Sequence, residues 1–124
     1  MVASPWQVKF VDLREDEDAF SELVDDESLT TKQIAKINKQ MEKLERHGPN
    51  LGAGFFENAE GSKRKLKEFK ITTDKVEIRY LYKLIGTMFL MLKGYKHKRK
   101  SDVNRHLGTA EARLEEWERR NESR

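Results

Sequence analysis

A basic run with one aromatic residue is the feature of the sequence that points most directly to a chemistry. Six of the eight residues from Lys93 to Lys100 are lysine, arginine or histidine, and Tyr95 lies among them. Cationic side chains bind phosphate groups, and an aromatic ring offers a flat face on which a base can stack. The run therefore predicts contact with a nucleic acid. A solvated loop between a strand and a helix is the alternative interpretation.

Arg79 is a second cationic candidate, in the middle of a predicted strand. Strict alternation places it on the same face as Glu77 and opposite Tyr80. A guanidinium on a rigid strand can hold a phosphate with two parallel hydrogen bonds. Lys70 and Glu68 can lie beside it on the neighbouring strand, which would give a concave cationic surface. Glu77 and Glu68 are also competitors, because an ion pair with either would occupy the guanidinium.

Other chemistries have little support in the sequence. His47, His97 and His106 show no metal-ligand spacing, and the chain has no cysteine for a zinc site or a thiol nucleophile. No glycine-rich phosphate loop or dinucleotide motif occurs. We therefore expect neither a metal nor a cofactor.

Charge is distributed unevenly along the chain. Residues 1–60 hold 7 Lys/Arg against 13 Asp/Glu, whereas residues 61–124 hold 18 against 9. A basic second half favours a polyanionic partner, and the phosphate backbone is the commonest one. Charged residues make up 38% of the chain, so the predicted core is modest. No apolar run approaches the ~20 residues that span a bilayer, and the N-terminus does not resemble a secretory signal. We expect a cytoplasmic protein.

The elements that would position these residues follow from hydrophobic periodicity. At 124 residues the chain suits a single domain, residues 1–124. The order β-α-α-β-β-β-α predicts an α+β fold, a small antiparallel sheet with helices on one face. The first strand is expected at Trp6–Leu13, followed by a short helix with an acidic first turn around residues 15–24, and residues 48–62 are expected to form a loop. The next expected element is a helix from Thr30 to Gly48, with Thr30 as N-cap and Gln33 completing a capping box. Its buried stripe is expected to be Ile34, Ile37, Met41 and Leu44. The remaining expected elements are strands at Lys65–Ile71, Lys75–Tyr82 and Thr87–Lys93, and a helix at Asp102–Asn121.

The second half of the chain resembles a known family. Its short motifs have the order and spacing of the RelE/ParE toxin superfamily, and they are most similar to the phage-derived HigB-like branch. The motifs are Leu66–Lys70, Arg79–Tyr82, Met88–Leu92, Tyr95–Lys98 and Ala110–Arg113 with Trp117. The chain departs from the family pattern at Lys70, where arginine is usual, at Tyr95, where phenylalanine is usual, and at His97, which replaces a lysine.

The resemblance implies the toxin of a type II toxin–antitoxin pair. Such toxins are RelE-like folds that cleave mRNA, typically in the ribosomal A site, without a metal. The 2′-hydroxyl attacks the phosphate, and a 2′,3′-cyclic phosphate results. The implied partners are a cognate antitoxin, expected to be a small helix-turn-helix protein, and mRNA with the ribosome; no membrane is implied. Two alternatives remain open: a ParE-like gyrase poison, and a basic module that binds nucleic acid or protein without catalysis.

The resemblance and the basic residues together define the candidate site. The predicted catalytic residues are Arg79, Tyr95, His97 and Lys98. The predicted substrate-binding residues are Lys70, Lys93, Lys96, Arg99 and Lys100.

Overall fold

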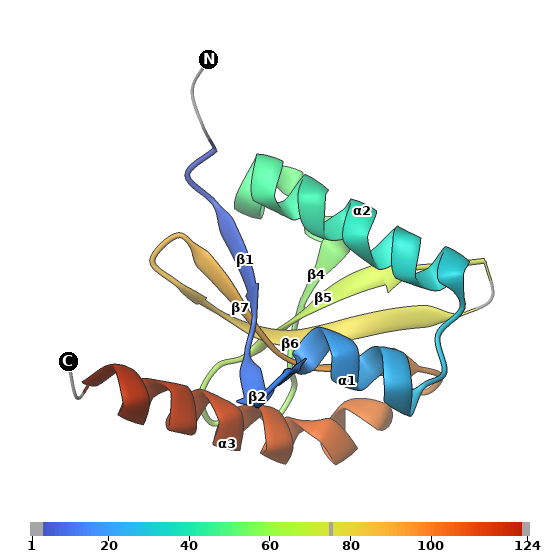
Figure 1. The fold of residues 1–124 in the computed structure, drawn as a ribbon. Coiled ribbons are helices and arrows are strands. Elements are labelled where there is room, and N and C mark those ends of the chain that lie inside the picture. The colour runs from blue at the N-terminus through green and yellow to red at the C-terminus, as the bar shows by residue number, and fades with distance from the viewer. Residues whose placement is uncertain (1–3, 75, 123–124) are drawn as a thin grey trace.

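A five-stranded sheet forms the centre of the molecule, seen in a computed structural model that describes residues 4–74 and 76–122 (Figure 1). The strand order is β1-β7-β6-β5-β4. Its strands are β1 (Gln7–Phe10), β4 (Phe56–Asn58), β5 (Lys67–Thr72), β6 (Glu77–Ile85) and β7 (Met88–His97). The predicted α+β class is confirmed. The sheet is mixed instead of antiparallel throughout, because β1 runs parallel to β7.

Helices cover both faces of this sheet, with α2 and α3 on opposite sides of it (Figure 1). The helices are α1 (Ala19–Asp26), α2 (Thr31–His47) and α3 (Asp102–Glu122). We call one face the Tyr80 face (Phe69, Ile78, Tyr80 and Tyr82) and the other the Arg79 face (Glu68, Glu77, Arg79 and Tyr95).

Contacts from each helix show which face it covers. On the Tyr80 face, the Tyr80 hydroxyl donates a hydrogen bond of 3.2 Å to the carbonyl oxygen of Ala19 in α1. On the Arg79 face, His106 of α3 stacks on Tyr95. The prediction that the helices share one face is therefore wrong. Helices cover both faces because both carry buried apolar residues that need a cover. Leu81 and Leu90, on the Arg79 face, are as fully buried as Tyr80.

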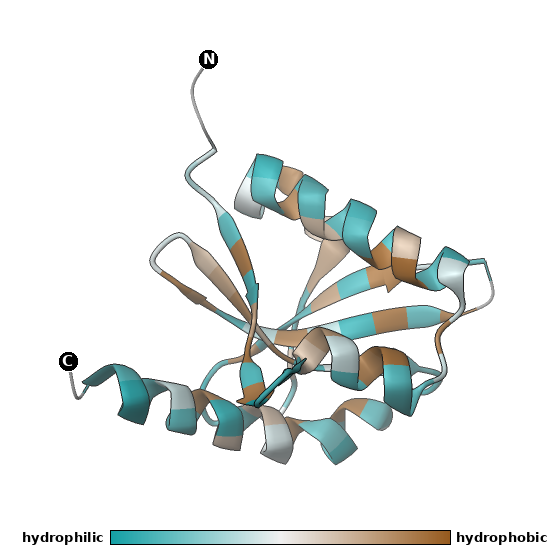
Figure 2. Cartoon of the chain, viewed as in Figure 1, coloured by the Kyte–Doolittle hydropathy of each residue, from teal (hydrophilic) through white to brown (hydrophobic). Residues whose placement is uncertain are grey.

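Helix α2 forms where its sequence predicts. The Thr30 hydroxyl accepts a hydrogen bond from the backbone N–H of Gln33, and the Gln33 side chain accepts one from the N–H of Thr30. Its predicted core residues Ile37 and Leu44 are fully buried. Figure 2 shows the apolar residues of α2 on the side toward the sheet and polar ones on the side away from it. The helix is thus fixed by its cap and by one apolar stripe.

Several boundaries differ from the prediction. The first strand ends at Phe10, and a separate hairpin of β2 (Asp12–Arg14) and β3 (Glu17–Asp18) follows it, so Asp18 caps α1 instead of lying within its first turn. The expected loop at 48–62 contains the 3-10 turns η1 (Gly48–Leu51) and η2 (Ala53–Phe55) as well as β4. Residue Lys75, the expected start of the second meander strand, lies outside the described residues. Among residues 4–74 and 76–122, no helix is both long and apolar enough to cross a bilayer.

A bulge in β7 decides which side chains reach the Arg79 face. Leu81 pairs with Lys93 and Tyr82 pairs with Met91, so Leu92 is an extra residue in β7. Before this bulge, even-numbered residues of β7 such as Leu90 point to the Arg79 face. After it, odd-numbered residues point there instead. Tyr95 and His97 are therefore brought to the face that carries Arg79.

Substitution by alanine should change the stability of the fold in opposite directions at Gly94 and Gly108. A Cβ on Gly94 would lie 2.7 Å from Cζ of Tyr80 and 2.9 Å from Cδ2 of Leu23, whereas one on Gly108 would meet nothing within 4 Å. We expect Gly94→Ala to destabilise the fold by ~1–3 kcal/mol through overpacking. Gly108→Ala should stabilise α3 by up to ~1 kcal/mol. Urea titration of both variants measures this, and a neutral Gly94→Ala would contradict the close packing of α1 against β7.

Candidate functional site

The Arg79 face carries a carboxylate, a guanidinium and an imidazole side by side at the end of the β6–β7 pair. Glu77 and His97 are direct cross-strand partners, so their Cβ atoms are about 4.5–5.5 Å apart. Arg79 is the next residue along β6 on this face, and its Nε donates a hydrogen bond of 2.6 Å to Oε2 of Glu77. Register and a direct bond thus bring these three side chains together.

Three carboxylates surround the guanidinium of Arg79. Besides Glu77, its Nη1 lies 2.8 Å from Oε2 of Glu57 in β4 and 3.4 Å from Oε2 of Glu68 in β5. The Arg79 side chain is 12% exposed. Burial alone would lower the pKa of Arg79, but the Glu77 hydrogen bond and the three negative charges outweigh it and raise that pKa. Arg79 therefore keeps its positive charge and links strands β4, β5 and β6 through its three carboxylate partners.

Tyr95 belongs to a buried layer behind this cluster. Its hydroxyl donates a hydrogen bond to Glu68, which is itself buried. Its ring is stacked on His106 with centroids 4.7 Å apart and lies edge-on to His97 at 6.2 Å. Burial and the bond to Glu68 raise the pKa of Tyr95, so the phenol stays protonated. Because Tyr95 is 2% exposed, its ring is not offered to a base as the sequence predicted, and it supports its neighbours instead.

His97 lies between that layer and the surface. It is half-buried at the end of β7, in a strand where the sequence predicted a loop. Its Nδ1 is buried and has no hydrogen-bond partner among the described residues. The imidazole is thus positioned by packing against Tyr95 and by its place opposite Glu77.

The exposed cations follow directly after His97. Lys98, Arg99 and Lys100 are exposed in the short connection to α3. The carboxylate of Asp102 accepts hydrogen bonds from the backbone N–H groups of Lys98 (2.7 Å) and Arg99 (2.9 Å), and these bonds lower the pKa of Asp102. A fixed backbone turn therefore presents these three cations beside the cluster.

The other predicted cations are divided between the two faces. Lys70 lies opposite Arg79 in the register and on its face, and it makes no hydrogen bond or ion pair with the described residues. Lys96 lies on the Tyr80 face, where its Nζ donates to the carbonyl oxygen of Glu27. The structure therefore brings Lys70 to the cluster and leaves Lys96 outside it.

Lys93 is engaged at the edge of the sheet, beyond the part of β7 that β1 covers. Its Nζ lies 3.2 Å from Glu22 and 3.8 Å from Asp26, both in α1. Glu22 also pairs with Arg113 of α3, whose Nη1 bonds the carbonyl oxygen of Leu92. Lys93 is thus part of an ion cluster that joins α1, β7 and α3.

This ion cluster should make the free energy of unfolding depend on pH. Burial alone would raise the pKa of Glu22, but Arg113 and Lys93 outweigh it and lower that pKa. A carboxylate with a lowered pKa stabilises the fold at neutral pH, and this contribution is lost as pH falls through and below its ordinary range. We expect the gap in unfolding free energy between wild type and Glu22→Gln to be largest at neutral pH and to close in acid. A gap independent of pH between 7 and 3 would contradict the role of the Glu22 charge.

Two carboxylates that contact Arg79, those of Glu77 and Glu57, were missed as functional candidates in the sequence. Glu77 was considered only as a competitor for Arg79, and Glu57 lies in a segment expected to be a loop. The signal for Glu77 was present, because it shares a strand face with Arg79. Within the described residues, no group of three or more histidine, aspartate or glutamate side chains is arranged to hold a metal ion.

Comparison of the chain with protein-family models, curated proteins and solved structures finds no match. The similarity to the RelE/ParE superfamily therefore remains an interpretation of short motifs. The cluster of Glu77, Arg79 and His97 and the cations beside it are the features of the structure that bear on function.

Proposed function

We propose that the protein is an endoribonuclease of the RelE/HigB-like toxin type, which cleaves mRNA through the 2′-hydroxyl. The observation that carries the proposal is the cross-strand pair of Glu77 and His97 with Arg79 bonded to Glu77. A carboxylate and an imidazole on one rigid surface are a base and an acid that can act on opposite sides of one phosphate. Neither role requires a cofactor.

The proposed reaction uses each group once. Glu77 takes the proton of the 2′-hydroxyl, and the 2′-oxygen attacks phosphorus. As the bond from phosphorus to the 5′-oxygen breaks, His97 in its protonated form donates a proton to that oxygen. The products are a 2′,3′-cyclic phosphate and a 5′-hydroxyl. Arg79 holds the Glu77 carboxylate in place and contributes positive charge next to the developing phosphorane.

Cations around the cluster would hold the RNA. Lys70 lies across from Arg79 with its ammonium group unpaired among the described residues, and Lys98, Arg99 and Lys100 extend the positive surface. Contacts to the phosphate backbone bind without regard to sequence and weaken as salt rises. This surface supports the proposal that the substrate is mRNA held in the ribosome, and we propose the cytoplasm as the site of action. A small helix-turn-helix antitoxin is the proposed partner that keeps the protein inactive.

Induction of the protein in bacteria tests this function. We expect growth arrest, with new 5′ ends inside coding sequences that appear within minutes of induction. His97→Gln, expressed to the same level, should give neither. Growth arrest without new mRNA 5′ ends would contradict the proposal and would favour a target other than RNA.

A further inference from the structure

An aromatic cavity on the Tyr80 face lies outside the cluster of Glu77, Arg79 and His97. It has a volume of about 440 Å³ and lies near the β6–β7 turn, at the end of the sheet away from His97. Its lining residues are Pro49, Phe56, Lys65, Lys67, Tyr82, Lys83, Leu84 and Phe89. A cavity of this size matches those that bind small molecules.

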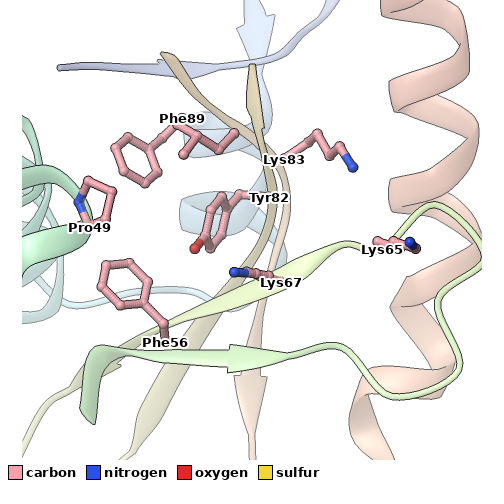
Figure 3. Close-up of a pocket in the computed structure, with 8 residues that line it drawn as sticks. Pro49, Phe56, Lys65, Lys67, Tyr82, Lys83 and Phe89 are labelled. Carbon is pink, nitrogen blue, oxygen red and sulfur yellow. The ribbon is translucent and has the colours of Figure 1, made fainter. Parts of the chain in front are cut away.

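Three aromatic rings and one proline ring surround this cavity. Figure 3 shows the rings of Pro49, Phe56, Tyr82 and Phe89 around a common space. The centroids of Tyr82 and Phe89 are 5.6 Å apart and those of Tyr82 and Phe56 are 6.2 Å apart. Leu84, which is 38% exposed, adds an apolar edge. Tyr82 and Phe89 are buried and form the floor of the cavity, whereas Phe56 is half-buried and its ring can stack on a planar, aromatic group.

Cations accompany these rings, and no carboxylate is present among the described residues that line the cavity. Lys67 is the cross-strand partner of Tyr82, and Figure 3 shows its ammonium beside the Tyr82 hydroxyl. Lys65 and Lys67 are both exposed, whereas Lys83 donates a hydrogen bond to the carbonyl oxygen of Arg64. Burial raises the pKa of Tyr82 to about 12, so its hydroxyl remains a neutral donor. The ligand should therefore combine a flat ring with negative charge.

We propose that this cavity binds a nucleotide, with the base against Phe56, Pro49 and Leu84, over the buried rings of Tyr82 and Phe89, and the phosphate at Lys67, with Lys65 adding positive charge further along the rim. One base and one phosphate supply both the planar group and the charge that the walls require. A free nucleotide and a nucleotide within an RNA strand share this chemistry. The cavity and the cleavage cluster lie on opposite faces of the sheet, so the inference stands whether or not the protein cleaves RNA.

Calorimetric titration of the intact protein with adenosine 5′-monophosphate tests this site. We expect saturable binding, which Lys65→Glu/Lys67→Glu weakens by about tenfold or more, a loss of at least ~1.4 kcal/mol. The matched control, Lys39→Glu/Lys63→Glu, has the same change of charge at exposed residues outside the cavity and should leave the affinity within about twofold. Leu84→Ser should also weaken binding, since it removes apolar contact without touching the buried core.

Further probes separate the two halves of the ligand and its source. Adenosine and ribose 5-phosphate should each bind more weakly than the nucleotide; equal binding of ribose 5-phosphate would overturn the role of the rings. A pentaglutamate peptide that competes as well as the nucleotide would overturn the proposal of a nucleotide site. Equal losses of affinity in Lys65→Glu/Lys67→Glu and Lys39→Glu/Lys63→Glu would also overturn it. The source of the nucleotide is tested with a 2′-O-methyl pentaadenylate, which cannot be cleaved through a 2′-hydroxyl. If it binds more tightly than the mononucleotide, the result supports an RNA strand as the source. Weaker binding would support a free nucleotide.

Discussion

His97→Gln is expected to slow RNA cleavage by ~10²–10⁴-fold, the usual contribution of a positioned acid or base. Glutamine keeps much of the side-chain volume but cannot donate a proton to the leaving 5′-oxygen. Glu77→Gln should have an effect of the same scale, because it removes the proposed base. The double variant should lose little more than either single one, since residues that act together in one step do not contribute additively. Rates measured in single turnover, with the melting temperature of each variant, check these expectations.

A neighbouring lysine provides the control for this experiment. Lys96 precedes His97 in β7, but its side chain lies on the opposite face and bonds the end of α1. Lys96→Gln should therefore leave the rate of cleavage nearly unchanged, although the basic run alone would assign it to the substrate. Equal losses in Lys96→Gln and His97→Gln would mean that general positive charge, and not the face of the strand, determines activity.

Arg79→Ala is expected to destabilise the protein by about 3–5 kcal/mol, the cost of leaving a buried charge without its partner. Glu68 is 3% exposed and would lose its cation, while Glu57 and Glu77 would repel each other across the gap. This is a large fraction of the 5–15 kcal/mol typical of a whole domain. Chemical denaturation measures the loss.

A paired variant separates the charge effect from a simple loss of packing. In the background Glu68→Gln, whose amide oxygen can still accept the Tyr95 hydrogen bond, Arg79→Ala should cost clearly less. The coupling between the two positions is read from a double-mutant cycle. A cost of under 1 kcal/mol for Arg79→Ala in the wild-type background would contradict the ion network.

The sequence predicted those elements whose signals are local. Thr30 and Gln33 form the expected capping box, and the repeat that includes Ile37 and Leu44 is the buried stripe of α2. Both features depend on residues within a few positions of one another. The α+β class follows from the same kind of periodicity, in a chain where helical and alternating segments are clearly separated.

The site depends on relations that the sequence does not display. The bulge at Leu92 is what turns Tyr95 and His97 toward Arg79, and strict alternation from the apolar part of β7 would place them on the other face. The basic run was expected to be a loop because it follows the apolar run Thr87–Lys93, and lysine is depleted in strands. Pairing with β6 nevertheless extends β7 through His97.

The burial of Tyr95 was missed for a related reason. Its bond to Glu68 joins residues 27 positions apart, through strands that meet only in the folded sheet. An aromatic ring inside a basic run indicates base stacking when the sequence is considered alone. In the structure His106, from α3, covers that ring.

Cleavage of a matched pair of oligonucleotides tests the central claim most directly. One is an mRNA fragment programmed in the ribosomal A site, and the other differs only by a 2′-deoxyribose at the scissile position. We expect the first to be cut to a fragment with a 2′,3′-cyclic phosphate end, and the second to remain intact in the same complex. Equal cleavage of both oligonucleotides would contradict a reaction through the 2′-hydroxyl. Cleavage of the first at the wild-type rate by His97→Gln and Glu77→Gln would contradict a reaction at the cluster of Glu77, Arg79 and His97.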